Sequence, residues 1–488
     1  MSMASDTGKG IESQVQRLAS NGIALAVGGI VAQLAFTLLE ILVARKLGAE
    51  AYGTFVTAYA WTVLAAFLME IGTPLWTIQE GSRYHDRIPA LLGSGLTVNM
   101  VMFAFCYVLL AAVTTMVTPN PVLGFLLVIL PYGLILTVQN SLGSVYSSYQ
   151  TMQVNAFFQG VAPVAILLVY FIFSANDLLL SEVGYAFVIG GGVITGIWFV
   201  LTVRKVRPQV SIRSITTTLR SSYQYGLSGI LGQVYYKADV VLLSALAGLQ
   251  EAGIYAAAFK VVELVQKVAI LSGRVFAPAI FKASHESEAT FQIFASMMTR
   301  ILTVAGLAAG LVSFVLADEI IALMFGEEFA ASAPVLKVLG GVMAAMCMTV
   351  SLQLLLSSID MHVHRVVCLG IALAAHIGAN VILIPRFGAL GAASATLFSG
   401  VLLILLYAGS AARRRSFKFL RWLLVPSFLA VVIAAATVLA GVNAWLGVAG
   451  GMVAFAVGLF VTGFAHRGEV QFVLRSIFSP AEAAENEN

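Results

Sequence analysis

The chain alternates between long apolar runs and short polar connections. A helix needs about 20 mostly apolar residues to cross a membrane, because the hydrocarbon core is about 30 Å thick and each residue adds about 1.5 Å. Fourteen runs meet this requirement: 23–47, 53–78, 90–116, 121–145, 153–174, 182–203, 223–247, 252–275, 292–317, 332–358, 363–384, 389–411, 422–440 and 443–465. The pattern predicts an all-α polytopic membrane protein with about 14 transmembrane helices.

Composition agrees with this prediction. Of the 488 residues, 60% are apolar and 10% are charged, and the mean hydropathy is +0.95. Soluble domains are about 45–50% apolar and about 25% charged. The chain is therefore not expected to be a soluble enzyme, a nucleic-acid binder or a disordered protein. The apolar runs are too long and too continuous for the alternating strands of a membrane β-barrel.

The positions of lysine and arginine predict the orientation. With the N-terminus placed inside, 18 of the 27 basic residues fall in inner segments, and the outer segments hold only Arg45, Lys46 and Arg386. This bias follows the positive-inside rule for a protein of the cytoplasmic (inner) membrane with both termini in the cytoplasm. We expect no cleaved signal peptide, with Ile23 beginning a retained span. The cytoplasmic termini are then residues 1–22 and 466–488.

A weak internal repeat suggests two related halves. At an offset of 200 residues, seven of 40 positions are identical between 21–60 and 221–260. The first copy contributes Gly29, Ile30, Gln33, Leu42, Gly48, Gly53 and Ala58. Chance similarity between apolar segments is the alternative. If the repeat is genuine, it predicts an N-lobe of six spans (23–203), a basic linker (204–222), a C-lobe of six spans (223–411) and two additional spans (412–465). Such repeats are typical of secondary transporters, whose substrates bind between the two halves.

Charged residues inside the spans are the strongest functional signal. A charge at the bilayer centre costs about 2.5–3.5 kcal/mol, so such residues are rarely accidental. The cations are Lys237, Lys260, Lys267, Arg274 and Arg300, and the acids are Glu40, Glu70, Asp239 and Glu263. At about 100° per residue, the four charges of span 252–275 share a helical stripe about 60° wide. A stripe of this kind must face other charges or a polar cavity.

Two interpretations of these charges remain open. They could be structural ion pairs between helices, such as Lys260–Asp239, Lys237–Glu263 and Glu70–Arg300. Alternatively, the five cations bind an anionic ligand such as a diphosphate, because the second lobe holds more cations than acids. The four acids would then balance the empty site or take up H⁺ or Na⁺ as a coupling ion.

Other chemistry is not indicated. The sequence has no Walker loop, zinc spacing or nucleophile elbow, so we expect no catalytic residues, no metal site and no cofactor. The three histidines near the later spans, His362, His364 and His376, do not form a metal-ligand set. The cysteines Cys106, Cys347 and Cys368 lie in apolar runs, which favours a packing role.

Four segments resemble a known family. They are LVARKLGAEAYGTF at 42–55, DVVLLSALAGLQEAGIY at 239–255 with Pro278 beyond it, IALMFGEEF at 321–329 and IPRFGALGAA at 384–393. The chain resembles the polysaccharide transporters and O-antigen flippases of the multidrug/oligosaccharidyl-lipid/polysaccharide exporter superfamily. The resemblance implies two six-helix lobes in a V (MATE-like), alternating access and a cationic central cavity. It also implies a polyprenyl-diphosphate-linked oligosaccharide as substrate.

The sequence therefore predicts a flippase for lipid-linked oligosaccharide in polysaccharide or lipopolysaccharide biosynthesis, not an enzyme. Its expected partners are membrane lipid, the lipid-linked substrate and polysaccharide polymerase machinery, with no nucleic acid. One alternative is a cation-coupled multidrug exporter of the same superfamily, which would favour an acidic cavity. The other is a membrane polysaccharide ligase or polymerase, for which the outer connections are short.

Overall fold

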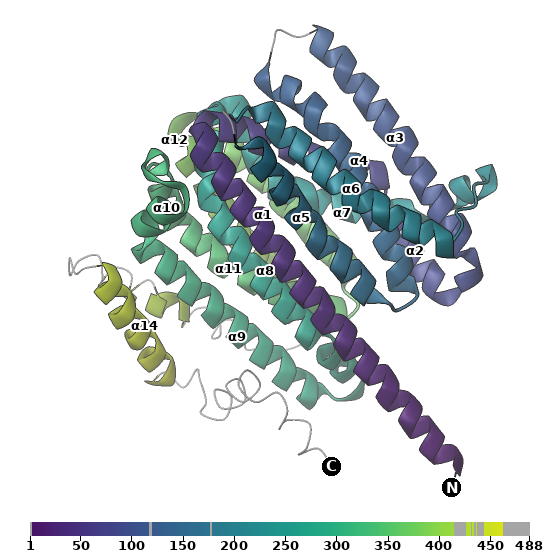
Figure 1. Cartoon of the computed structure of the whole chain (residues 1–488). Helices are drawn as coiled ribbons and strands as arrows, with labels where there is room; N and C mark the ends of the chain where they lie inside the picture. The colour runs from purple at the N-terminus through teal and green to yellow at the C-terminus, as the bar shows by residue number, and fades with distance from the viewer. Residues whose placement is uncertain are drawn as a thin grey trace. The chain divides into compact units, whose positions relative to one another are not determined.

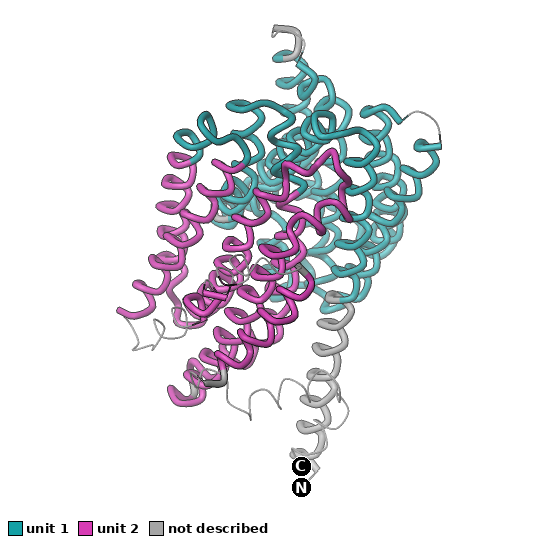
Figure 2. Tube along the Cα trace, turned by 90° about the vertical axis from the view of Figure 1, so that its left-hand side faces the viewer, with its two compact units in different colours: residues 1–257, 380–389 teal, residues 258–379, 390–488 magenta. Residues whose placement is uncertain are grey.

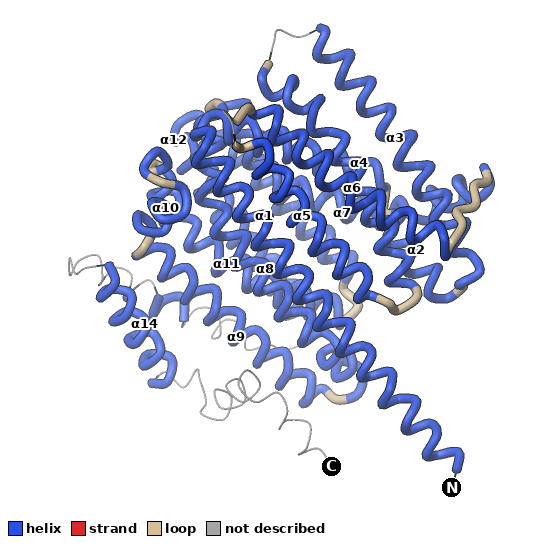
Figure 3. Tube along the Cα trace, in the orientation of Figure 1, coloured by secondary structure: helices blue, strands red, loops and turns tan. Residues whose placement is uncertain are grey.

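The computed structural model describes residues 2–116, 120–175, 178–413, 426–430, 432–433, 436 and 444–461. Within these ranges all regular structure is helical and no strand occurs (Figure 3). The all-α fold class is therefore confirmed. The helices are labelled in Figure 1.

The first helix, α1, runs over Ser2–Glu70 and holds the first two predicted spans. It is broken by Gly48, whose φ of 79° and ψ of 174° are not helical. Glycine adopts positive φ without a Cβ clash, which explains why the predicted turn lies at this residue. The second span ends at Glu70, before its predicted end at 78.

A second break separates α1 from the short helix α2 (Thr73–Arg83). Ile71 and Gly72 both have positive φ, at 47° and 76°. A left-handed β-branched residue is a steric outlier. Pro74 then fits the first turn of α2, where its missing N–H is not needed.

Most of the remaining helices coincide with predicted spans, and a few short ones lie in the connections. The remaining helices are η1 (His85–Arg87), α3 (Ile88–Met116), α4 (Pro121–Ser148), α5 (Met152–Phe173), α6 (Leu180–Lys205), α7 (Ile212–Leu246), α8 (Leu249–Glu286), α9 (Glu288–Val315), α10 (Ala317–Phe325), η2 (Glu327–Phe329), α11 (Ser332–Ser358), α12 (His362–Ala412) and α14 (Ala444–Val461). Gly388, with φ 55° and ψ −131°, divides α12 into two spans.

Two elements differ from the prediction. α7 begins at Ile212, so much of the segment 204–222 is helical, and Ser211 caps it by accepting a hydrogen bond from the Ser214 amide at 3.1 Å. The polar first turns of α7 concealed this helix from a hydropathy pattern. The short helix α10 lies in a segment expected to be a connection, and it ends at Gly326 with φ 89°.

Eight helices in the described ranges are long and apolar enough to cross a membrane. Two of these, α1 and α12, contain a break and hold two predicted spans each. α7, α8 and α14 coincide with three further predicted spans. The predicted span 422–440 lies mostly outside the described residues. A multi-pass membrane protein is thus confirmed.

The chain divides into two compact units (Figure 2). Unit 1 contains residues 1–257 and 380–389, and unit 2 contains residues 258–379 and 390–488. In unit 1, Trp198 stacks on Phe158 with ring centroids 4.9 Å apart, in a core with Ile88 and Leu142. In unit 2, α9 and α11 approach closely where Gly310 meets Gly340. The division into lobes 23–203 and 223–411 stays a prediction.

Candidate functional site

A reciprocal glycine contact joins the two copies of the repeat within unit 1. A Cβ added at Gly53 would overlap the Leu249 carbonyl oxygen, and one at Gly253 would overlap the Ala49 carbonyl oxygen. Residues 49 and 249, like 53 and 253, are related by the 200-residue offset. Equivalent residues that contact each other reciprocally are the mark of a local two-fold axis.

Three predicted acids lie in unit 1, and neutral groups bind each of them. Glu40 is 3% exposed and accepts a hydrogen bond from the Tyr52 hydroxyl at 3.3 Å. Glu70 is 6% exposed, and the Asn140 amide donates to its Oε1 at 2.7 Å. Buried carboxylates need such donors, because an unpaired polar group loses its hydration without compensation.

Asp239 on α7 is held by two helices. It is 2% exposed, and the Tyr255 hydroxyl donates to its Oδ2 at 2.7 Å. The Asn380 amide donates to its Oδ1 at 2.9 Å. Lys237, two residues earlier on α7, is half-buried. Asp239 thus connects α7, α8 and the residues just before the break of α12.

The predicted stripe lies on one continuous helix, α8, but its members differ in environment. Lys260 is 5% exposed and forms an ion pair with Glu263 at 2.5 Å. Lys267 and Arg274 are exposed. Lys267 lies within electrostatic range of the other three charges. One end of the stripe is therefore buried and paired, whereas the other presents two exposed cations.

The last predicted cation, Arg300 of α9, donates to the Ser296 hydroxyl at 3.3 Å. The three ion pairs considered from the sequence would each join the two units, and they stay predictions. On α11, Lys337 pairs with Asp318 of α10 at 2.8 Å, which the sequence pattern did not indicate.

Sequence reasoning missed the groups that bind the acids: Tyr52, Asn140, Tyr255 and Asn380. Asn140, Tyr255 and Asn380 are polar side chains within apolar runs, which is the signal that could have identified them. Tyr52 lies in the connection between the first two runs and carries no such signal. The spacing along one helix does not reveal such a partner, because most of these bonds join different helices. Their pairing depends on how the helices are rotated against each other.

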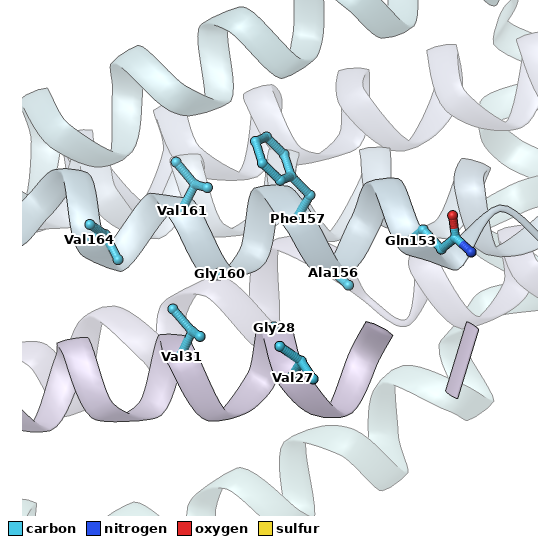
Figure 4. A pocket seen from close by; sticks show the side chains of 9 residues that line it. All are labelled: Val27, Gly28, Val31, Gln153, Ala156, Phe157, Gly160, Val161 and Val164. Carbon is cyan, nitrogen blue, oxygen red and sulfur yellow. The ribbon is translucent and has the colours of Figure 1, made fainter. Parts of the chain in front are cut away.

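An apolar groove lies between α1 and α5 in unit 1 (Figure 4). Its volume is about 360 Å³, and Gln153 is its one polar lining residue. A Cβ at Gly28 would overlap the Ala156 backbone, so the glycine permits close helix packing. The groove contains no charged residue and therefore does not match the predicted diphosphate site.

Solved structures with a similar fold are transporters. A lipid II flippase, MurJ, in an inward closed conformation has a TM-score of 0.71 at 12% identity, covering 90% of this chain and 98% of that chain. An inward-facing multidrug resistance MATE family transporter of the MOP superfamily has a TM-score of 0.63 at 14% identity, with coverages of 79% and 96%.

A third is a MOP superfamily transporter from Pyrococcus furiosus, described as having a binding pocket of reverse polarity that suggests a different function. Its TM-score is 0.59 at 14% identity, with coverages of 82% and 96%. No curated protein matches the chain. At these identities the likeness concerns the fold alone.

The family follows from the sequence match. The polysaccharide biosynthesis protein family matches residues 18–284, which is more than half of the chain. The chain belongs to this family, and the resemblance noted in the sequence is confirmed.

Proposed function

We propose that the chain is a flippase, which moves a polyprenyl-diphosphate-linked oligosaccharide across the cytoplasmic membrane by alternating access. The observation that carries the proposal is the α8 stripe in a member of the polysaccharide biosynthesis protein family. Its exposed cations Lys267 and Arg274 would each cost about 2.5–3.5 kcal/mol if they faced lipid. We infer that they line an aqueous path.

The spacing of the stripe suits a diphosphate. Successive cations at 260, 267 and 274 are seven residues apart, which is about 10 Å along the helix axis. Long lysine and arginine side chains reach across much of that distance, so a diphosphate can bind one cation before it leaves the previous one. Arginine can contact phosphate with two parallel hydrogen bonds. Lys260 is compensated by Glu263 until the ligand competes for it.

The other predicted residues fit the same scheme. Lys237 and Arg300 would add positive charge to the path. Glu40, Glu70 and Asp239 would balance these cations or take up H⁺ or Na⁺. The lipid tail would remain in the bilayer while the head group crosses. Both termini would be cytoplasmic, lipid-linked oligosaccharide and polymerase machinery would be the partners, and no covalent step would be catalysed.

The decisive experiment measures flipping of a fluorescent polyprenyl-diphosphate oligosaccharide in proteoliposomes at equal protein content. We expect Lys267→Ala and Arg274→Ala each to reduce the rate at least tenfold. Lys337→Ala is the matched control, because it removes a cation that lies outside α8 and pairs with Asp318, and it should stay within twofold. Wild-type rates in both α8 variants would overturn the proposal.

The two rivals have their own tests. A cation-coupled multidrug exporter would protect cells against cationic drugs, which a basic path does not favour. A polysaccharide ligase or polymerase would incorporate labelled sugar when purified, without a membrane gradient. We expect neither activity.

A further inference from the structure

A cluster of buried polar groups surrounds the break between α1 and α2. It draws on four helices of unit 1, α1 to α4. Its members are at most 6% exposed: Glu70, Thr73, Asn99, Thr137 and Ser141. Polar groups at membrane depth are costly unless they are satisfied. The cluster therefore calls for an explanation beyond packing.

One hydroxyl of the cluster is left without a partner. Thr73 is 1% exposed, and its Oγ1 has no hydrogen-bond partner among the described residues. It faces the space beside Gly95 on α3: a Cβ there would lie 3.7 Å from Thr73 Oγ1 and 3.9 Å from Ser141 Oγ. Two hydroxyl oxygens from different helices thus converge on a gap that the missing Cβ leaves.

An amide oxygen and a helix end border the same region. The Asn99 amide is best placed with its nitrogen donating to the carbonyl oxygens of Met69, at 3.3 Å, and Gly95, at 3.2 Å. Its oxygen then accepts a hydrogen bond from the Ser141 hydroxyl at 3.1 Å. Met69 lies in the last turn of α1, where carbonyl groups lack a helical partner.

The negative charge comes from Glu70, at the end of α1. Its carboxylate is bound by Asn140, the residue directly before Ser141 on α4. A single carboxylate with neutral hydroxyl and amide oxygens suits a small monovalent cation. Water would fill the gap but would not compensate a buried charge. In transporters, the ends of broken helices commonly lie at Na⁺ sites. No group of three His, Cys, Asp or Glu side chains suited to a metal occurs in the described residues.

We propose that the α1–α2 break is a Na⁺ site, in which Thr73 Oγ1, Ser141 Oγ and the Asn99 amide oxygen bind the ion beside the Glu70 carboxylate. The site also touches α7. Gly72, within the break, packs against the backbone of Ser222 and Gly226. Occupancy of the site therefore acts on the contact between the break and α7. Its role as the coupling site rests on the proposed transport function, whereas ion binding does not.

Thermal unfolding of the purified full-length protein tests the site. Measurements in NaCl, KCl and choline chloride at equal ionic strength separate a specific ion from general screening. A ligand that binds only the folded state raises the midpoint saturably. We expect Na⁺ to raise the midpoint by several degrees over K⁺ in the wild type. The same midpoint in Na⁺ and K⁺ would overturn the site.

Variants locate the ion. Thr73→Val and Ser141→Ala remove one hydroxyl each and should raise the Na⁺ concentration for half-saturation at least tenfold. Gly95→Ala places a methyl group in the gap at ordinary contact distance and should have the same effect. Thr57→Val is the matched control, because Thr57 is a buried threonine of α1 that also lacks a described partner. A wild-type Na⁺ response in all three cluster variants would contradict the assignment.

The same protein separates this inference from the proposed function. If lipid flipping fails in proteoliposomes but the Na⁺-specific shift and its loss in Thr73→Val remain, the site stands and the transport proposal fails. If flipping proceeds but Na⁺ and K⁺ stabilise the protein equally, the transport proposal stands and the Na⁺ site is wrong.

Discussion

The two repeat copies fold alike at their turns but carry different chemistry. In the first copy, Gly48 has φ 79° and precedes Gly53 by five residues; in the second, Gly248 has φ 98° and precedes Gly253 by five. In each copy the later glycine, Gly53 or Gly253, packs against the backbone of the other copy. After its turn, however, the first copy has one intramembrane charge, Glu70, whereas the second has the four charges of α8.

The shared glycines therefore have a structural role, whereas the differing charges have a functional one. The glycines are shared because both copies need a tight turn and a close helix contact. The charges differ because one copy provides an anion at a helix break and the other a row of cations. Substitutions at the glycines should therefore have similar effects in both copies, whereas substitutions at the charges should not.

The largest loss of stability is expected at the reciprocal contact. Gly53→Ala and Gly253→Ala each place a Cβ inside a backbone carbonyl of the other copy. Overpacking typically costs about 1–3 kcal/mol, and a backbone obstacle cannot rotate away, so we expect about 3 kcal/mol in each copy. Denaturant unfolding of the purified variants measures this free energy. Gly29→Ala, with open space around its Cβ, is the control. A loss in only one copy would break the comparison.

The next largest loss of stability should differ between the buried end and the exposed end of the α8 stripe. Lys260→Met removes the ion pair with the Glu263 carboxylate, and breaking such a pair costs several kcal/mol at a fully buried site. Because Glu263 is 24% exposed, we expect about 2 kcal/mol. Lys267→Met, at an exposed position, should change the free energy of unfolding by about 0.5 kcal/mol or less. Chemical unfolding of both variants checks this contrast, and equal stabilities would contradict it.

A smaller loss of stability is expected when the tyrosines that bind Asp239 and Glu40, the acids before the two turns, lose their hydroxyl groups. Tyr255 donates to Asp239 at 2.7 Å, and Tyr52 donates to Glu40 at 3.3 Å. Hydrogen bonds to charged groups contribute about 1.5–3 kcal/mol when well formed. We expect Tyr255→Phe to cost about 1.5 kcal/mol and Tyr52→Phe less than about 1 kcal/mol. Unfolding midpoints of both variants measure the difference, and a larger loss in Tyr52→Phe would reverse the ranking.

The smallest effect is expected outside both copies. Lys337 and Asp318 form an exposed ion pair, with side chains 37% and 67% exposed. Such pairs contribute about 0–1 kcal/mol. Asp318→Asn should therefore lower the stability by about 0.5 kcal/mol or less, and the loss should shrink further in high salt. A loss as large as that of Lys260→Met would show that burial does not decide these costs.

Hydrophobic periodicity predicted the helices well because lipid imposes a simple length rule. It placed the breaks near Gly48, Gly248 and Gly388 because polar and glycine residues interrupt the runs there. The break at Ile71–Gly72 was missed, since the apolar run continues past it to 78. Positive φ at an isoleucine has no sequence signal.

The candidate site was only partly predictable. Helical angles placed Lys260, Glu263, Lys267 and Arg274 on one stripe, and α8 is indeed continuous there. The angles did not reveal that Lys260 is buried while Lys267 is exposed. Nor did they reveal the convergence of Thr73, Asn99 and Ser141, because these residues are uncharged and lie on three different helices. These features depend on packing between helices.

Direct binding of polyprenyl-diphosphate and polyprenyl-monophosphate oligosaccharides tests the central claim that the α8 cations recognise a diphosphate. The wild-type protein should bind the diphosphate at least tenfold more tightly than the monophosphate, and this ratio should fall to about one in the Lys267→Ala/Arg274→Ala double variant. An unchanged ratio in a folded double variant would contradict the account.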